Sequence, residues 1–315
     1  MAVTRALLVT GPAKVARGAG VVFSQDDISI DVSHETNILS TSAHGQVDER
    51  SSDSIVEATF TPEGRWTSAS RALLWPYGNA VPGDSIMGAD TPTLFHGSDG
   101  GLHTIPASAV TSMPSIFLSA SRTMIGPVTI RGVRKTGVEW SGAESLYATS
   151  PTGSTFADAT FAEAELIIQK YTGAWAAIGG FDAIETVDGW TIDFDLQIDP
   201  IVTDDLGTVD FRYRSLAVSA RCTPVDPLPA EILVAQQIQG TGAARGRSLA
   251  AGPGAVASDL IITGANGTTV ITLKNAALKG VGFRFGASVL REGEIAFVAG
   301  RPFTTGVKGA IFTLA

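Results

Sequence analysis

The chain has 315 residues, of which 44% are hydrophobic and 17% are charged, and its formal net charge is −9 at pH 7. This balance, together with 35 glycines and 15 prolines, favours an ordered, turn-rich chain over a disordered one. The acidic excess argues against a protein that clamps nucleic acid, because affinity for phosphates comes largely from Lys and Arg. The single cysteine, Cys222, excludes an intramolecular disulfide.

The chain begins with an apolar stretch at residues 5–11 that predicts an N-terminal strand. The stretch is too short for the core of a signal peptide, and no run approaches the roughly 20 apolar residues that span a bilayer. We therefore expect synthesis in the cytoplasm and no membrane partner. Residues 21–32 then alternate through Ile28, Ile30 and Val32, which predicts a strand.

The segment 45–62 predicts a long strand with two unlike faces. One face carries Val56, Ala58 and Phe60, and the other carries Glu57, Thr59 and Thr61. Such a strand needs a core on one side and water on the other. Residues 67–78 follow as the best helical candidate, with Thr67 and Ser68 as possible caps and Pro76 as its stop.

Residues 207–224 repeat residues 45–62 at an offset of 162, with eight of 18 positions identical. Chance would give about one or two identities. Weaker matches follow in the same order, 104–113 with 272–281 and 125–134 with 292–301. We therefore predict two copies of one domain, residues 1–155 and 156–315, joined near the turn-rich stretch at 150–156.

The second copy is expected to follow the first. Residues 160–173 have helical propensity, but alignment with the N-terminal strand favours a strand from about Glu165. Residues 187–198 predict a strand, and 226–240 predict the second helix. The long strand carries Leu216, Val218, Ala220 and Cys222 on its apolar face and Ser215, Ser219, Arg221 and Thr223 on its polar face. The position of Cys222 opposite Phe60 predicts a small buried apolar residue rather than a catalytic thiol. Asn266-Gly267 predicts a hairpin turn.

No catalytic or metal-binding pattern stands out. Residues 242–248 lack the length and the lysine of a phosphate-binding loop, and 97–101 is a turn rather than a nucleophile elbow. The four histidines, His34, His44, His96 and His103, lack the spacing of zinc ligands on a helix. We expect no enzyme, no cofactor and no metal.

The run GQVDERSSDSIVEATFTPEGRW, the helix ending LLWPYG, the loop GADTPTLFHGSDGGLHTI and the strand-rich AVTSMPSIFLSASRTMIGPVTIRGV resemble major tail tube proteins of long-tailed bacteriophages. AWAAIGGFDAIETVDGWTIDFDLQI resembles the start of a second tube domain. The resemblance implies a mainly β (α+β) chain with two tandem β-sandwich or barrel domains, each with one flanking helix.

The same resemblance implies a function in the virion tail. Such domains form rings that stack into a hollow tube for DNA, and two fused domains form trimers that imitate hexamers. The implied partners are further copies of the chain, tail-tip initiator and terminator proteins, a tape-measure protein in the lumen, and DNA in transit.

Two sets of residues are candidates for tube functions. Lumen-facing positions are expected on the polar faces of the long strands, at Glu57, Thr59, Thr61, Ser219, Arg221 and Thr223. The long connections 79–101 and 241–260 are candidates for contacts between rings, through Asp84, Asp90, Arg245 and Arg247. The alternative is that these polar positions are ordinary solvated ones, and that the chain is a duplicated β-sandwich binding module of a cell or virion surface.

Overall fold

The structure of the chain, a computed structural model, describes residues 13–63, 66–86, 91–97, 100–119, 124–132, 146–150, 174–178, 181–203, 207–225, 258–265, 267, 269–281, 284–286, 289–300, 303–304 and 307–315. These residues form antiparallel sheets and a single helix, so the prediction of a mainly β chain is confirmed. No helix among them has the length and apolar character needed to cross a membrane.

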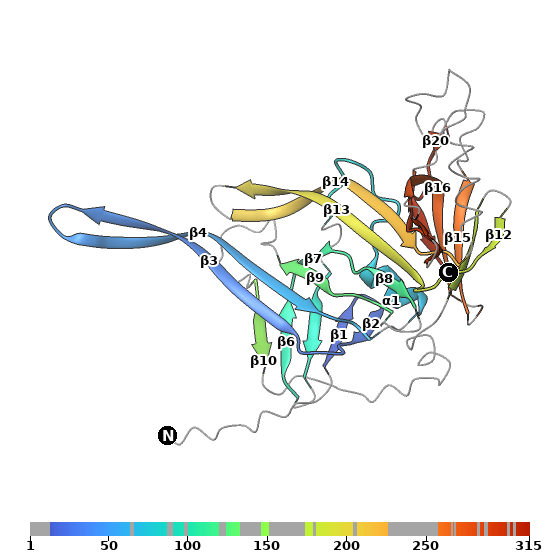
Figure 1. Cartoon of the computed structure of the whole chain (residues 1–315). Coiled ribbons are helices and arrows are strands. Elements are labelled where there is room, and N and C mark those ends of the chain that lie inside the picture. The colour runs from blue at the N-terminus through green and yellow to red at the C-terminus, as the bar shows by residue number, and fades with distance from the viewer. Residues whose placement is uncertain are drawn as a thin grey trace.

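The first half of the chain builds two sheets (Figure 1). A five-stranded sheet has the order β10-β6-β5-β1-β2, and a four-stranded sheet has the order β3-β4-β9-β7. The strands of the first half are β1 (Lys14–Arg17), β2 (Gly20–Phe23), β3 (Ser29–Thr41), β4 (Gly45–Phe60), β5 (Thr93–His96), β6 (Leu102–Ile105), β7 (Ser108–Ser112), β8 (Ile116–Leu118), β9 (Val128–Gly132) and β10 (Ala148–Ser150). Of these, β8 belongs to the sheet of the second half.

The second half builds one nine-stranded sheet, which follows the path β12-β11-β15-β16-β19-β14-β13-β8 with β22 also paired to β16. Two short hairpins of the second half, β17-β18 and β20-β21, form separate two-stranded sheets. The strands are β11 (Ala174–Ile178), β12 (Phe181–Ile184), β13 (Trp190–Thr203), β14 (Gly207–Cys222), β15 (Ser258–Gly264), β16 (Val270–Val281), β17 (Arg284–Gly286), β18 (Val289–Glu292), β19 (Ile295–Val298), β20 (Phe303–Thr304), β21 (Val307–Lys308) and β22 (Phe312–Leu314).

The long hairpins β3-β4 and β13-β14 have matching registers. Ile30 lies opposite Ala58, and Ile192 lies opposite Ala220 at the same offset of 162. Both bulges of the first hairpin, at 35/36 and 39/40, recur in the second at 197/198 and 201/202. The tip glycines Gly45 and Gly207 both have positive φ, 66° and 71°.

The strands beyond the hairpins also correspond. β9 pairs with β4 as β19 pairs with β14, and β7 pairs with β9 as β16 pairs with β19. The second half differs in that β16 runs without a break through the positions of both β6 and β7. In the first half Pro106 separates these two strands, because proline cannot donate to a sheet ladder.

The two-faced pattern of the long strands is confirmed. Val56, Ala58 and Phe60 are buried, as are Leu216, Val218, Ala220 and Cys222, and both sets belong to one core. The residues between them remain at least partly accessible. Period-two alternation therefore places one side of each strand against apolar neighbours.

The helix α1 (Ser68–Leu74) begins as predicted, with Thr67 as its N-cap. The Thr67 hydroxyl accepts from the Ser70 backbone N–H, and the Ser70 hydroxyl accepts from that of Thr67. The helix ends at Leu74, two residues before Pro76, because the residue before a proline disfavours helical backbone. It packs closely on β2, where a Cβ at Gly20 would lie 2.7 Å from the carbonyl oxygen of Ala69.

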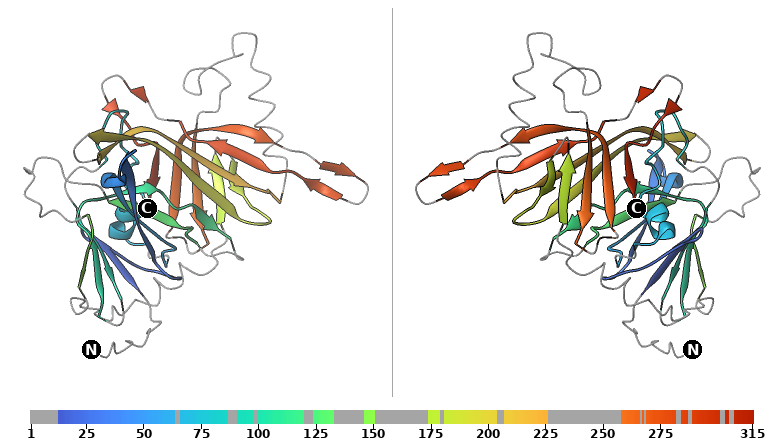
Figure 2. Two further views of the ribbon diagram at one scale, coloured as in Figure 1. Left: turned by 90° about the vertical axis from the view of Figure 1, so that its left-hand side faces the viewer. Right: turned by 90° about the vertical axis from the view of Figure 1, so that its right-hand side faces the viewer.

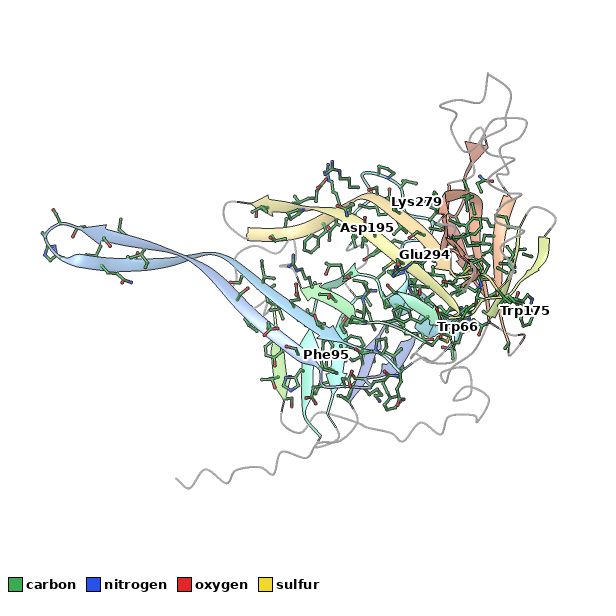
Figure 3. The ribbon with its side chains drawn as sticks, in the orientation of Figure 1. Trp66, Phe95, Trp175, Asp195, Lys279 and Glu294 are labelled. Atoms are coloured by element: carbon green, nitrogen blue, oxygen red, sulfur yellow. The ribbon has the colours of Figure 1, made fainter. Side chains whose placement is uncertain are left out.

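The two halves are joined by both strand pairing and core packing. β8 pairs with β13, and residues 83–86 run along β14. The rings of Trp75 and Phe194 lie 6.1 Å apart, and Trp66 Nε1 donates to the carbonyl of Ala315 over 2.7 Å. Trp66 lies among the side chains where these parts meet (Figure 3).

Several sequence expectations need correction or remain outside the described residues. The strand expected at 21–32 is broken at 24–28, where Ser24 turns away to bridge with Pro62. The connection 79–101 contains β5, and β15 begins within 241–260. β15 and β16, on either side of the predicted turn, are antiparallel, and Gly267 has a φ of 71°, whereas Asn266 lies outside the described residues. The strand at 5–11, the segment from Glu165 and the helix at 226–240 lie outside the described part.

Candidate functional site

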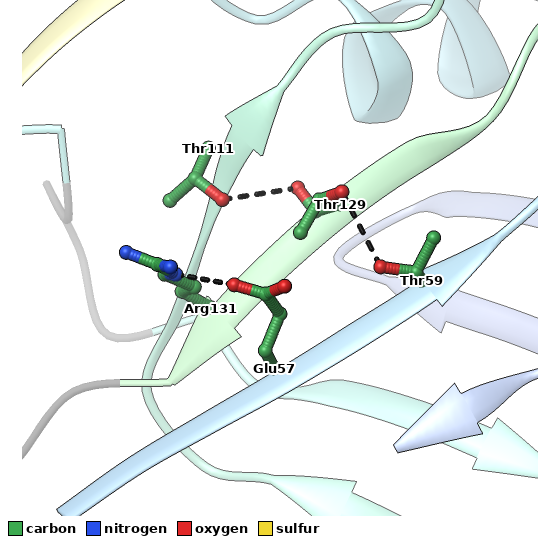
Figure 4. Close-up of polar contacts among 5 residues, drawn as sticks. All are labelled: Glu57, Thr59, Thr111, Thr129 and Arg131. Atoms are coloured by element: carbon green, nitrogen blue, oxygen red, sulfur yellow. Dashed lines mark hydrogen bonds and ion pairs between the residues drawn. The ribbon is translucent and has the colours of Figure 1, made fainter. Parts of the chain in front are cut away.

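The polar face of the first long sheet carries a row of cross-strand contacts (Figure 4). Glu57 and Arg131, which are directly opposite on β4 and β9, form an ion pair of 2.5 Å. Two residues along each strand from this ion pair, the hydroxyls of Thr59 and Thr129 lie 3.3 Å apart. Thr111 on β7 donates to the carbonyl of Thr129. Glu57 and Thr59, the two candidates on β4, thus belong to one continuous polar surface.

The equivalent face of the second sheet carries a different ion pair. Arg221 Nε lies 3.5 Å from a carboxylate oxygen of Asp193 on β13. The hydroxyl of Ser115, from the first half, donates to the same carboxylate over 2.7 Å. Ser219 lies directly opposite Asp193 in the ladder. Asp193 is therefore the acidic neighbour of Arg221 that the sequence alone did not reveal.

Each of these two faces carries one ion pair, and the first also carries Asp31, directly opposite Glu57. Each face pairs one base with one acid, and the four side chains are between 35% and 53% exposed. Ion pairs at such exposure are well screened and contribute little stability. Their effect is to offset the positive charges of the two arginines on a surface that also carries threonines and serines.

Thr61 and Thr223 occupy matching places at the ends of the two strands. The Thr61 carbonyl accepts from Gln25 N–H over 2.8 Å, and the Thr223 carbonyl accepts from Val187 N–H over 2.9 Å. Through their backbone carbonyls, both residues thus bind the segment that leads into the first strand of each hairpin. Both side chains are half-buried.

A small cavity of about 140 Å³ adjoins the second face. Its lining includes Asp188, Arg221, Cys222 and Glu294. Burial, together with the charge of Glu294, raises the pKa of the Cys222 thiol, which keeps the sulfur protonated and poorly nucleophilic at neutral pH. The described residues include no cluster of three or more His, Cys, Asp or Glu suited to a metal ion.

The candidates for contacts between rings are only partly placed. Asp84 lies in a turn beside β14, where its carboxylate accepts from Val81 N–H over 2.8 Å and its carbonyl accepts from Tyr213 N–H over 2.9 Å. Its side chain thus holds its own turn. Asp90, Arg245 and Arg247 lie outside the described residues.

The contacts that sequence reasoning missed come from β8 and β9. Arg131 follows the alternation of β9, so that a period-two assignment of residues 128–132 would have placed it on the polar face. Ser115 and β8 carried no such signal, because a three-residue strand takes its partner from the tertiary fold. A comparison with protein-family models gives no match, and no curated protein is significantly similar to the chain.

Proposed function

We propose that the chain is a structural protein of a bacteriophage tail, which assembles into stacked rings around a hollow lumen. The observation that carries this proposal is the equivalence of the two long hairpins, in register, bulges and strand neighbours. Each half then represents one tube domain, with the halves divided near residue 155. Three chains would provide six quasi-equivalent domains for one ring.

The way the halves join supports assembly by repetition. The first half contacts the second through β8 and residues 83–86, which is a head-to-tail contact between two equivalent units. Head-to-tail contacts of one kind close into rings when the rotation between units divides a full turn. A closed ring also satisfies sheet edges that a single chain leaves unpaired.

The polar faces of the long sheets are the proposed lining of the lumen, at Glu57, Thr59, Thr61, Ser219, Arg221 and Thr223. Their locally neutralised charges suit passage of a tape-measure protein and then of DNA, without tight binding of either. Initiator and terminator proteins would close the two ends of the tube. The location of the assembled protein is the virion tail.

Electron microscopy with native mass measurement tests the proposal. The purified protein is concentrated, stained and averaged, alone and with tail-tip components. Hollow six-lobed rings with the mass of three chains support it. A strict monomer under every condition contradicts it and favours a duplicated surface-binding module, the alternative that the sequence left open.

A further inference from the structure

The β13-β14 hairpin is flanked on both edges by the first half. On the outer edge of β13, β8 places Leu118 opposite Trp190 and Ile116 opposite Ile192. On the outer edge of β14, the N–H of Ile86 donates to the carbonyl of Phe211 over 2.9 Å, within the run 83–86. The first half thus pairs with part of each edge of the second hairpin, at 190–192 of β13 and 211–213 of β14.

The equivalent β3-β4 hairpin has no such partners in the described part of the chain. There β3 pairs with β4 alone, and β4 pairs on its other edge only from Val56 to Phe60, with β9. The hairpin projects far from the body of the molecule (Figure 1). An uncovered strand edge is a template for pairing with another chain.

Two side chains of the β3-β4 hairpin are more exposed than their counterparts in the β13-β14 hairpin. Val47 is 47% exposed, whereas Val209, the same residue type at the matching position, is 6% exposed. Val32 is 48% exposed, whereas its counterpart Phe194 is 8% exposed beneath the rings of Trp75 and Phe312. The surface that is covered on one hairpin is therefore open on the other.

The second half also holds the counterpart of β8. Ile116 bridges to Ile125 in the first half, and Arg284 pairs with Glu292 in the second, so β17 corresponds to β8 at an offset of 168. β17 pairs with β18 only, as far as the structure describes the chain. The β17-β18 hairpin projects from the edge of the molecule (Figure 2).

We propose that β17 of one copy adds to the outer edge of β3 in a second copy of this chain, in the register that β8 and β13 use within the chain. Arg284 then lies opposite Ile30, Phe285 opposite Ser29, and Gly286 opposite Ile28. The inference rests on the proposed function, which supplies the assembly, and it adds the strands and the register.

The contact is directional, because each copy offers one β3 edge and one β17 hairpin. Its apolar component is the covering of Val32, which lies two residues beyond the paired segment of β3 and is 48% exposed in the single chain. The two joints differ at one position. Gly189, directly before β13, has a φ of +84°, whereas its counterpart Asp27 has no positive φ.

Paired cysteines test the register directly. In a Cys222→Ala background, Ser29→Cys and Phe285→Cys are combined in one chain and mildly oxidised under assembly conditions. The matched control combines Thr191→Cys with Phe117→Cys, the equivalent pair within the chain. We expect covalent oligomers ending at a trimer from the first variant, and a monomer with consumed thiols from the control. Each single-cysteine variant should give at most a dimer.

A second variant tests the surface without relying on disulfide geometry. Val32→Lys should raise the protein concentration needed for half-assembly at least about tenfold, because a lysine would be buried against the partner. Val187→Lys is the control, since Val187 and its counterpart Gln25 are both exposed within the chain. It should assemble normally.

The outcomes separate this inference from the function on which it rests. Rings that form without the cross-link, with Val32→Lys assembling normally, overturn the strand pairing and leave the tube function standing. Cross-linked chains of open length, without closed rings, support the pairing and overturn the ring. A protein that stays monomeric and forms no cross-link overturns both.

Discussion

Gly189 lies at the joint between the two halves, and its replacement by alanine is the sharpest test of that joint. Its φ is +84°, a conformation that residues with a Cβ rarely adopt. A Cβ at this position would lie 2.1 Å from the carbonyl oxygen of Leu118 and 2.7 Å from the Cα of Ser119. Both are backbone atoms of the segment that pairs with β13, so no side-chain rotation relieves the contact.

Two costs add in the Gly189→Ala variant. A left-handed backbone costs an alanine about 1 kcal/mol relative to glycine. Overpacking against a fixed backbone costs about 1–3 kcal/mol more. We therefore expect the free energy of unfolding to fall by about 2–4 kcal/mol, mainly through separation of β8 from β13.

Urea unfolding followed by tryptophan fluorescence measures this loss, because Trp190 is buried beside the substitution. Gly267→Ala is the matched control, since Gly267 has a φ of +71° and no atom within 4 Å of the added Cβ. The control should lose only the backbone term of about 1 kcal/mol. Equal losses in the two variants would refute the packed joint.

Three further substitutions test the helix cap, the polar face and the buried thiol. Thr67→Ala removes the capping oxygen of α1 and should cost about 1 kcal/mol in urea unfolding, whereas the exposed Ser68→Ala should cost little; equal losses would contradict the cap. Glu57→Gln should cost less than about 1 kcal/mol, and the loss should shrink at high salt, since its ion pair is partly exposed; a loss that salt does not change would count against the pair. Burial raises the pKa of Cys222, so stability should be fully present below the unfolded thiol pKa of about 8.5 and should fall as pH rises above it, by up to about 1.4 kcal/mol per pH unit. Cys222→Ala should lack that component of the pH dependence, and parallel curves for the two proteins would rule it out.

The sequence predicted the parts of the fold that depend on local period and on repetition. Alternation assigned the buried and accessible faces of β4 and β14, because a half-buried strand alternates with period two. The repeat offset predicted which segments would occupy matching places. The cap at Thr67 followed from the capping preference of the residue before a helix.

The remaining features depend on contacts between distant segments. The break at residues 24–28 contains Ser24 and Asp26-Asp27, which are residue types that favour turns, and the bridge from Ser24 to Pro62 places it at this point of the strand. The neutralisation of Arg221 requires Asp193 on the adjacent strand, two positions from its direct partner Thr191. Pairing of β8 with β13 requires the two halves to dock, and no local propensity encodes that arrangement.

The placement of the bulges explains how β3 can stay open to a partner without pairing indiscriminately. The hairpin has two bulges, opposite 35/36 and 39/40 of β3 and toward the projecting tip, where the extra residues lie on β4 and increase the twist of the strand pair. The segment from Ser29 to Val32 has no bulge. In β13 the unbulged segment with the same position is the one that β8 occupies. The chain thus protects most of the exposed edge and leaves regular backbone at the point where its own second half shows how a strand can be added.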